Sequence, residues 1–258
     1  MRILAVVNQK GGVGKTTTTV NLAASLAAAK RRVLLVDLDP QGNATMGSGI
    51  DKRKAVKTVY HVLLGQASLA EARMSSTRGG YELVASNRDL AGAEVELVQI
   101  EHRETRLREA LEQCHEQYDF ILLDCPPALN LLTLNALVAA HAVLIPMQCE
   151  YYALEGLSDL VQTIRRVKER LNPALEIDGL LRTMYDPRNT LAQQVSRDLM
   201  THFGDKVYRT IVPRNVRLAE APSYGIPVLE LDRRSKGALA YLALAGELIT
   251  RDEQQEMR

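Results

Sequence analysis

The sequence has few cysteines, almost no net charge and no long apolar segment. Its three cysteines, Cys114, Cys125 and Cys149, are widely spaced and form no C-x-x-C pair, which argues against a disulfide framework or a zinc site. No apolar run reaches the ~18 residues that a bilayer-spanning helix needs, and the apolar run at 3–7 is too short for a signal peptide. We therefore expect a soluble, cytosolic protein.

The net charge of +1 comes from 32 lysines and arginines against 31 aspartates and glutamates. A chain-wide basic signature for nucleic acid is absent, so any DNA contact must come from a local patch. No internal repeats appear, and 258 residues with 46% apolar content suit one large α/β domain over residues 1–258. Because the first expected strand begins almost at Met1, we expect no separate N-terminal DNA-binding domain.

A glycine-rich stretch near the N-terminus carries the clearest chemical signal. The sequence K-G-G-V-G-K-T-T at 10–17 follows the strand-like run 3–7 and leads into the Ala-rich, helix-like segment 18–29. Strand, glycine loop and helix form the context of a phosphate-binding loop, in which backbone N–H groups and the helix N-terminus hold the anion. Lys15 is then expected at the β- and γ-phosphates, and Thr16 at Mg²⁺. Thr17 is close enough to reach the α-phosphate.

The loop departs from the strict G-x-x-x-x-G-K-[ST] pattern, because Gln9 stands where the first glycine belongs. A second lysine, Lys10, opens the loop, which makes this the deviant Walker A form. Lys10 lies on the far side of the loop from Lys15, and we interpret it as reaching the nucleotide of a facing subunit. The simpler alternative is a solvated loop lysine.

Two aspartates follow the next buried strand. The apolar run at 33–37 comes after one helix, so it closes a βαβ unit with a parallel sheet. Ligands of such sheets bind outside the carboxyl ends of the strands, which places Asp37 and Asp39 beside the phosphate loop. Alternatively, both carboxylates only cap the turn that Pro40 and Gly42 favour.

The segment D-F-I-L-L-D at 119–124 reads as a Walker B strand. Asp124 at its end would hold Mg²⁺, through water, because Mg²⁺ keeps much of its hydration shell. Four apolar residues and an aspartate are a weak signal alone, but a strong one together with the phosphate loop. Cys125 opens a rigid Pro-Pro turn at 126–127, where a γ-phosphate sensor would sit, and we interpret it as a small buried side chain rather than a redox group.

The remaining pattern predicts an α/β fold of the P-loop NTPase class, a mostly parallel twisted sheet with helices on both faces. Residues 47–78 are the hardest to assign. The further expected strands are 81–85, 142–146, 176–184 and 207–212. The expected helices are 58–64, 68–73, 129–140, 151–171, 189–203, a single turn at 216–221, and 235–250 with Ser235 as its N-cap; 89–117 is expected to form one long helix or a pair.

The base of the nucleotide is marked less clearly than its phosphates. The N-K-x-D signature of guanine-specific GTPases is absent, which favours ATP. The turn at 213–215 follows the last expected strand and is a candidate adenine contact. Since phosphoryl transfer asks for positioning and charge neutralisation, Lys15 and Mg²⁺ would draw charge from the β–γ bridge. Asp39 would orient the attacking water, and Lys10 would act in trans, which makes ATP a bridge within a dimer.

Four blocks of sequence carry a family resemblance. The blocks at 8–17, 36–43, 123–127 and 212–225 resemble those of the ParA/Soj partition ATPases, and the likeness covers essentially the whole chain. The first and third are shared across the MinD/ParA class. The last resembles the chromosomal Soj subgroup more narrowly.

The resemblance implies properties that composition does not show. The family binds ATP with Mg²⁺, forms a homodimer around two nucleotides, and binds double-stranded DNA without sequence preference. A ParB-like partner stimulates hydrolysis and releases the ATPase from the nucleoid, which moves chromosome or plasmid origins. By motif match, the catalytic residues would be Lys10, Lys15 and Asp39; the metal residues Thr16, Asp39 and Asp124; and the nucleotide contacts Lys10, Gly11, Gly12, Val13, Gly14, Lys15, Thr16, Thr17, Pro213 and Asn215.

DNA contacts are expected from a local basic excess near the C-terminus. Residues 182–236 hold ten lysines and arginines against six aspartates and glutamates, an excess of four. Charge alone favours a mixed solvated surface, and the family likeness is what selects Arg188 and Arg217. Phosphate contacts by such residues would be sensitive to salt and blind to sequence.

Three alternatives compete with this interpretation. A MinD-like, membrane-cycling ATPase needs a C-terminal amphipathic helix with basic and bulky apolar faces, which 251–258 lacks. A nitrogenase-reductase-like protein needs two cysteines per subunit for a shared cluster, a pattern absent here. The third is a non-enzymatic, nucleotide-binding regulatory module, or a ParA-like protein that positions a cargo other than DNA. The ATPase core would look the same in either, so this alternative stays open.

Overall fold

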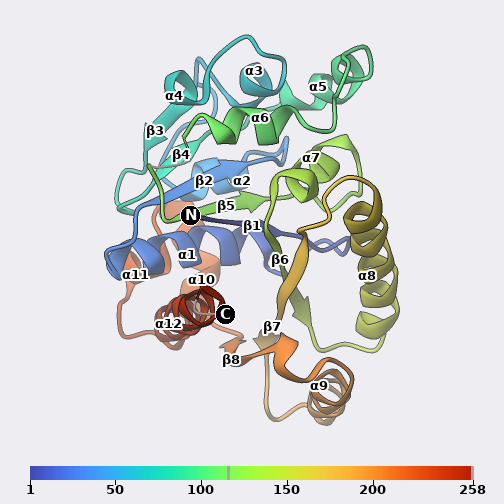
Figure 1. Cartoon of the computed structure of the whole chain (residues 1–258). Coiled ribbons are helices and arrows are strands. Elements are labelled where there is room, and N and C mark those ends of the chain that lie inside the picture. The colour runs from blue at the N-terminus through green and yellow to red at the C-terminus, as the bar shows by residue number, and fades with distance from the viewer. Residues whose placement is uncertain (115–116, 257–258) are drawn as a thin grey trace.

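The computed structural model describes residues 1–114 and 117–256, and within them eight strands form one sheet (Figure 1). The strand order is β3-β4-β2-β5-β1-β6-β7-β8, and every neighbouring pair is parallel except β3 with β4. The strands are β1 (Arg2–Val6), β2 (Val33–Asp37), β3 (Arg73–Ser75), β4 (Glu82–Val84), β5 (Phe120–Asp124), β6 (Ala142–Gln148), β7 (Glu176–Tyr185) and β8 (Val207–Pro213).

Helices cover both faces of this sheet, as Figure 1 shows. The helices are α1 (Lys15–Ala28), α2 (Asn43–Gly47), α3 (Val59–Leu63), α4 (Leu69–Ala72), α5 (Leu90–Leu97), α6 (Arg106–Glu112), α7 (Leu131–Ala139), α8 (Ala153–Arg170), α9 (Thr190–Phe203), α10 (Val216–Glu220), α11 (Val228–Leu231) and α12 (Lys236–Glu256), with the 3₁₀ segments η1 (Gly204–Lys206) and η2 (Ala221–Tyr224). In the described part of the chain, no helix combines the length and apolarity needed to cross a bilayer.

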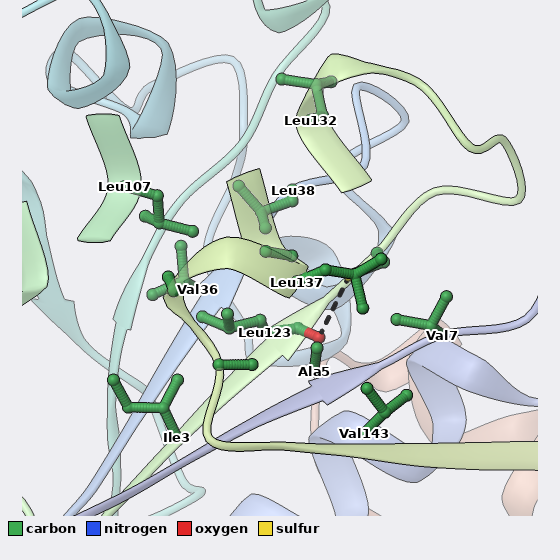
Figure 2. Close-up of a cluster of buried hydrophobic side chains, with 14 of the residues drawn as sticks. Ile3, Ala5, Val7, Val36, Leu38, Leu107, Leu123, Leu132, Leu137 and Val143 are labelled. Carbon is green, nitrogen blue, oxygen red and sulfur yellow. Dashed lines mark hydrogen bonds between the residues drawn. The ribbon is translucent and has the colours of Figure 1, made fainter. Parts of the chain in front are cut away.

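The core lies in two layers, one on each face of the sheet. Alternate residues of β1 point into opposite layers. Ile3 and Ala5 belong to the layer that contains α3 to α9, whereas Leu4 and Val6 belong to the layer that contains α1 and α12. Figure 2 shows the first layer, where side chains of β1, β2 and β5 meet Leu137 of α7. A strand buried on both faces has no polar side to present, which is why these strands read as continuous apolar runs.

The predicted fold class is confirmed, and the largest difference lies at one edge of the sheet. The expected helix 68–73 is shorter, because α4 ends at Ala72 and the chain continues as the antiparallel edge strand β3. Ser68 starts α4 through a capping box with Glu71, as its sequence favours. From Arg73 onward the chain pairs with β4 instead of continuing the helix. This tertiary contact has no signal in the local sequence.

The charged segment 89–117 is a pair of helices, α5 and α6, joined by a loop in which His102 has a φ of 54°. Residues 115 and 116 of that segment lie outside the described residues. The last helix begins after Ser235 as expected, since the Ala238 N–H donates to the Ser235 hydroxyl at 3.1 Å. It runs to Glu256 instead of ending near residue 250, and 257–258 are not described.

Ion pairs connect α12 to the amino edge of the sheet, the edge at which the parallel strands begin. The Arg2 guanidinium forms ion pairs with Asp178 of β7 and, at 2.7 Å, with Asp252 of α12. The Tyr208 hydroxyl also donates to Asp178, and the Arg251 guanidinium lies 4.3 Å from the centre of the Tyr208 ring. The amino edge, opposite the expected nucleotide edge, is therefore held by a connected polar network.

A bulge interrupts the pairing of β8 with β7. Inside it, the Arg182 guanidinium donates to the carbonyls of Tyr208, at 2.7 Å, and Arg209, at 3.3 Å. The Glu247 carboxylate of α12 accepts the N–H groups of Arg209 and Thr210 at 2.8 and 2.9 Å. Two charged side chains thus satisfy the backbone groups that the bulge removes from the ladder.

Candidate nucleotide site

The loop between β1 and α1 has the geometry of a phosphate cradle. Gly12 and Gly14 have φ angles of 74° and 87°, a left-handed conformation that glycine adopts without strain. A Cβ atom added at Gly11 or Gly12 would meet no atom within 4 Å, so the space over this part of the loop is open. Helix α1 starts directly afterwards with no acidic residue in its first turn, which leaves its N-terminus available to an anion.

Two neighbouring strands hold this loop in place. The Thr183 hydroxyl of β7 donates to the Val13 carbonyl at 2.8 Å. The Asn8 side chain accepts the Lys10 N–H at 2.9 Å and donates to the Pro146 carbonyl of β6 at 2.8 Å. The cradle is therefore positioned by β6 and β7 as well as by its own glycines.

The two loop lysines point in different directions. The Lys15 ammonium lies inside the loop, 3.1 Å from the Lys10 carbonyl, and burial lowers the pKa of Lys15 against the opposing pull of Asp124 and Asp39. The Lys10 ammonium instead forms an ion pair with Glu150, which follows β6. The side chains of this pair are 48% and 50% exposed. The Lys10 ammonium thus lies on the surface next to the loop instead of inside it.

Two buried aspartates lie side by side at the ends of β2 and β5. Asp124 accepts hydrogen bonds from the hydroxyls of Thr16, at 2.8 Å, and Thr19, at 2.9 Å. Burial, followed by the charge of Asp37, raises the pKa of Asp124 to about 8. Burial likewise raises the pKa of Asp37 to about 6, against the hydroxyl and N–H that Thr45 donates to it. The buried site therefore disfavours the ionised form of both carboxyl groups.

Asp39 lies at the open side of this cluster. Its N–H donates to the Asp37 carboxylate at 3.1 Å, and its carboxylate accepts the Gln41 N–H at 2.9 Å. The Ser86 hydroxyl donates a hydrogen bond to the Asp39 backbone carbonyl at 2.8 Å. The expected turn-capping contacts are therefore present, on a carboxylate whose charge also acts on Lys15 and Asp124.

The donor set fits Mg²⁺ bound together with a nucleotide. Among the described residues, no group of three or more His, Cys, Asp or Glu side chains forms a metal-binding cluster. Mg²⁺ in phosphate sites requires less protein, one or two oxygen ligands beside waters and phosphate oxygens. The hydrogen-bonded Thr16 hydroxyl and Asp124 carboxylate provide such oxygens, and a cation there would favour the ionised form of Asp124, which burial and the Asp37 charge disfavour.

The expected adenine contacts lie where β8 ends. Pro213 closes β8, and Asn215 caps α10 by accepting the Arg217 N–H at 3.1 Å, which leaves its amide N–H₂ group for a base. Arg214 between them lines a polar cavity of about 170 Å³ at the carboxyl ends of β6 and β7. The cavity is lined by Gln148, Cys149, Glu150, Met184, Tyr185, Asp186, Asn189, Ala192 and Arg214.

Both expected DNA-binding arginines are exposed and paired within the chain. Arg188 forms an ion pair with Asp186 at 2.8 Å, and this contact lowers the pKa of Asp186 to about 2. Arg217 pairs with Glu220 at 2.8 Å and with Asp232 at 3.6 Å. Part of the local basic excess is therefore compensated by neighbouring carboxylates.

Known proteins share this arrangement over nearly the whole chain. Residues 1–177 match the family model described as an AAA domain. The chain is 50% identical over 260 residues to the chromosome partitioning protein ParA of Caulobacter vibrioides, with 100% of this chain and 97% of that protein covered. It is 53% identical over 247 residues to the sporulation initiation inhibitor protein Soj of Bacillus subtilis, covering 96% and 98%. The chain belongs to the ParA/Soj family of partitioning P-loop ATPases.

A structure solved with a bound nucleotide shares the fold of this chain. Cobyrinic acid a,c-diamide synthase from Mycobacterium smegmatis, crystallised with an ATP analogue and magnesium, is 40% identical and superposes with a TM-score of 0.87. The match covers 98% of this chain and 96% of that one. The family resemblance predicted from the four sequence blocks is confirmed.

Several side chains that contact the site of this ParA/Soj family member were not predicted from its sequence. Thr19 lies one helical turn after Thr16, so helical spacing was a signal that could have found it. Thr183 and Glu150 lie at or just after the ends of β7 and β6. The rule that parallel strands end at the ligand edge could have placed them near the loop, although not in their contacts.

Proposed function

We propose that this ParA/Soj family member is a Mg²⁺-dependent ATPase that forms a homodimer with ATP and then binds double-stranded DNA without sequence preference. A ParB-like partner would stimulate hydrolysis and return the protein to a DNA-free form, which positions a chromosome or plasmid origin on the nucleoid. The observation that carries this proposal is the divergence of the two loop lysines, Lys15 toward the cradle and Lys10 toward the surface.

Residues of the chain position the phosphates. Lys15 exchanges its bond to the Lys10 carbonyl for phosphate oxygens, and the loop N–H groups hold the same anion. Thr16 and Asp124 would hold Mg²⁺, while Thr19 keeps the Asp124 carboxylate oriented. The bound cation would neutralise charge that develops on the β- and γ-phosphates.

Asp39 would orient the water that attacks the γ-phosphate. It sits on the turn directly after β2, close enough for its charge to act on both Lys15 and Asp124. The contacts from Gln41 and Ser86 fix this turn, so the carboxylate is pre-positioned instead of being ordered during the reaction.

Lys10 would complete the site of a second subunit. Its ammonium pairs with Glu150 on the surface, whereas the Lys15 ammonium lies inside the loop of the same chain. Neutralising phosphate charge with this ammonium requires a partner whose nucleotide faces the loop. The role corresponds to an arginine finger supplied in trans.

DNA binding is assigned to Arg188 and Arg217, which must exchange carboxylate partners for phosphates. The membrane alternative gains no support from the described part of α12, where two charges near its end contact the chain itself. Arg251 pairs with Glu247 at 3.0 Å, and Glu253 pairs with Arg31 at 2.9 Å. A surface helix for lipid needs an unoccupied basic face.

The test is sedimentation of the wild type and the Asp39→Ala variant, each with and without ATP, Mg²⁺ and DNA. We expect ATP-dependent dimers and DNA-bound complexes for both proteins. Only the wild type should revert to monomers as ATP is consumed. Sedimentation that does not depend on ATP would refute the proposal, and normal phosphate release by Asp39→Ala would remove Asp39 from the mechanism.

A further inference from the structure

Two adjacent tyrosines stand on the surface where β6 leads into α8. Tyr151 and Tyr152 are 73% and 70% exposed, although tyrosine side chains usually bury their rings. Their ring centres are 5.0 Å apart and their planes meet at 90°, an edge-to-face pair. The two rings therefore support each other while both remain open to solvent.

This tyrosine pair is placed next to the outward-pointing loop lysine. Tyr151 directly follows Glu150, whose carboxylate holds Lys10 across the edge of the phosphate loop. The turn that carries the pair is fixed, because the Ala153 N–H donates to the Glu150 carbonyl at 3.0 Å and α8 begins there. The exposed rings and the exposed Lys10–Glu150 pair therefore belong to neighbouring parts of the surface.

We propose that Tyr151 and Tyr152 form the aromatic anchor through which a second copy of this chain docks, and so bring the partner's nucleotide within reach of Lys10. This inference rests on the proposed function, which requires a partner on the Lys10 side. A two-fold interface presents the same patch from both subunits, so each tyrosine pair is buried in the same event that aligns both lysines.

The area involved suits that role. Tyrosine rings bury ~150–250 Å² each, so four rings that start about 70% exposed would hide on the order of 500 Å². A stable interface of standard size hides ~1,600 Å² in total, so the two pairs would supply about a third of it. Tyrosines are also enriched among residues that dominate binding energy, partly because they lose little side-chain freedom on binding.

The experiment is sedimentation velocity of the full chain with Mg²⁺ and a slowly hydrolysed ATP analogue, on the double variant Tyr151→Ala/Tyr152→Ala. We expect its monomer–dimer Kd to rise at least about tenfold, as for residues that anchor an interface. Because both rings are exposed, its thermal melting should match the wild type. Affinity of the monomer for a fluorescent ATP analogue should also stay unchanged.

Two controls separate an aromatic anchor from a general surface effect. Tyr151→Phe/Tyr152→Phe keeps the rings and should dimerise nearly as the wild type does. Tyr224→Ala removes a tyrosine that is 66% exposed on η2 and should leave the Kd unchanged.

The outcomes distinguish this inference from the proposed function. If the double alanine variant dimerises with the wild-type Kd, the tyrosine pair is not the anchor, and the ATP-dependent dimer stands. If it loses nucleotide affinity as a monomer, the rings serve the nucleotide pocket and the inference is wrong. If the wild type itself forms no dimer with the analogue, both the proposed dimer and the docking surface are refuted.

Discussion

The ion pair between Lys10 and Glu150 predicts that a single neutral substitution strengthens ATP-dependent dimerisation. In the isolated chain, Glu150 holds the ammonium that the proposed mechanism sends to the partner's nucleotide. Forming the dimer must then break this pair in each subunit. Glu150→Gln removes the competing charge without changing the size of the side chain, so more of the Lys10 population is free to act in trans.

The magnitude follows from the exposure of the pair. With side chains 48% and 50% exposed, solvent screens the attraction, and such pairs contribute about 0.2–1 kcal/mol each. Two pairs break per dimer, so the monomer–dimer Kd should fall about 2- to 30-fold at low salt. The difference should shrink at high salt, because the Debye length drops to about 3 Å at 1 M.

The assay is sedimentation velocity with Mg²⁺ and a slowly hydrolysed ATP analogue, at low and at high salt. A matched control is Glu176→Gln, which removes the Lys168–Glu176 pair, with side chains 40% and 60% exposed, at the far end of α8. The control should leave the Kd unchanged. If Glu150→Gln dimerises no more tightly than the wild type, Glu150 does not compete for Lys10 and the reasoning is refuted.

Three further predictions test other parts of the molecule. Arg217→Glu should weaken DNA binding at low salt and lower the salt dependence of the DNA affinity by about one counterion, with ATP affinity unchanged. A DNA affinity equal to that of the wild type would show that this arginine does not contact DNA. Thr183→Val should weaken ATP binding about 2- to 13-fold in calorimetry, because it removes a loop anchor worth about 0.5–1.5 kcal/mol. Asp178→Ala should lower the free energy of unfolding in urea by about 1.5–3 kcal/mol, since the buried Arg2 loses one of its two carboxylate partners and keeps Asp252. Asp51→Ala, which removes the exposed ion pair with Arg53, is its control and should leave the free energy of unfolding nearly unchanged.

Sequence patterns predicted the strands and helices whose apolar residues are buried in the core. Strands β1, β2 and β5 are buried on both faces, so each reads as an unbroken apolar run. One long helix or a pair was also predicted after residue 89, because apolar residues recur there at helical spacing. These residues are Leu90, Leu97, Ile100, Leu107 and Leu111, and all but the partly buried Ile100 are buried in the core.

The rest depended on contacts between distant segments. Strand β3 spans three residues, Arg-Met-Ser, with no apolar alternation, and it exists because β4 offers backbone partners. The Lys10–Glu150 pair joins residues 140 positions apart. No local pattern specifies such a pairing, since either side chain alone reads as a solvated charge.

The bulge in β8 constrains how copies of this chain can assemble. Unpaired backbone groups at a sheet edge invite strand addition from another chain. Here the edge strand β8 carries a bulge, and at the opposite edge β3 is only three residues long, two features that blunt a sheet edge. Polymers built by strand addition are therefore disfavoured. Any higher assembly would instead stack whole subunits through their side-chain surfaces.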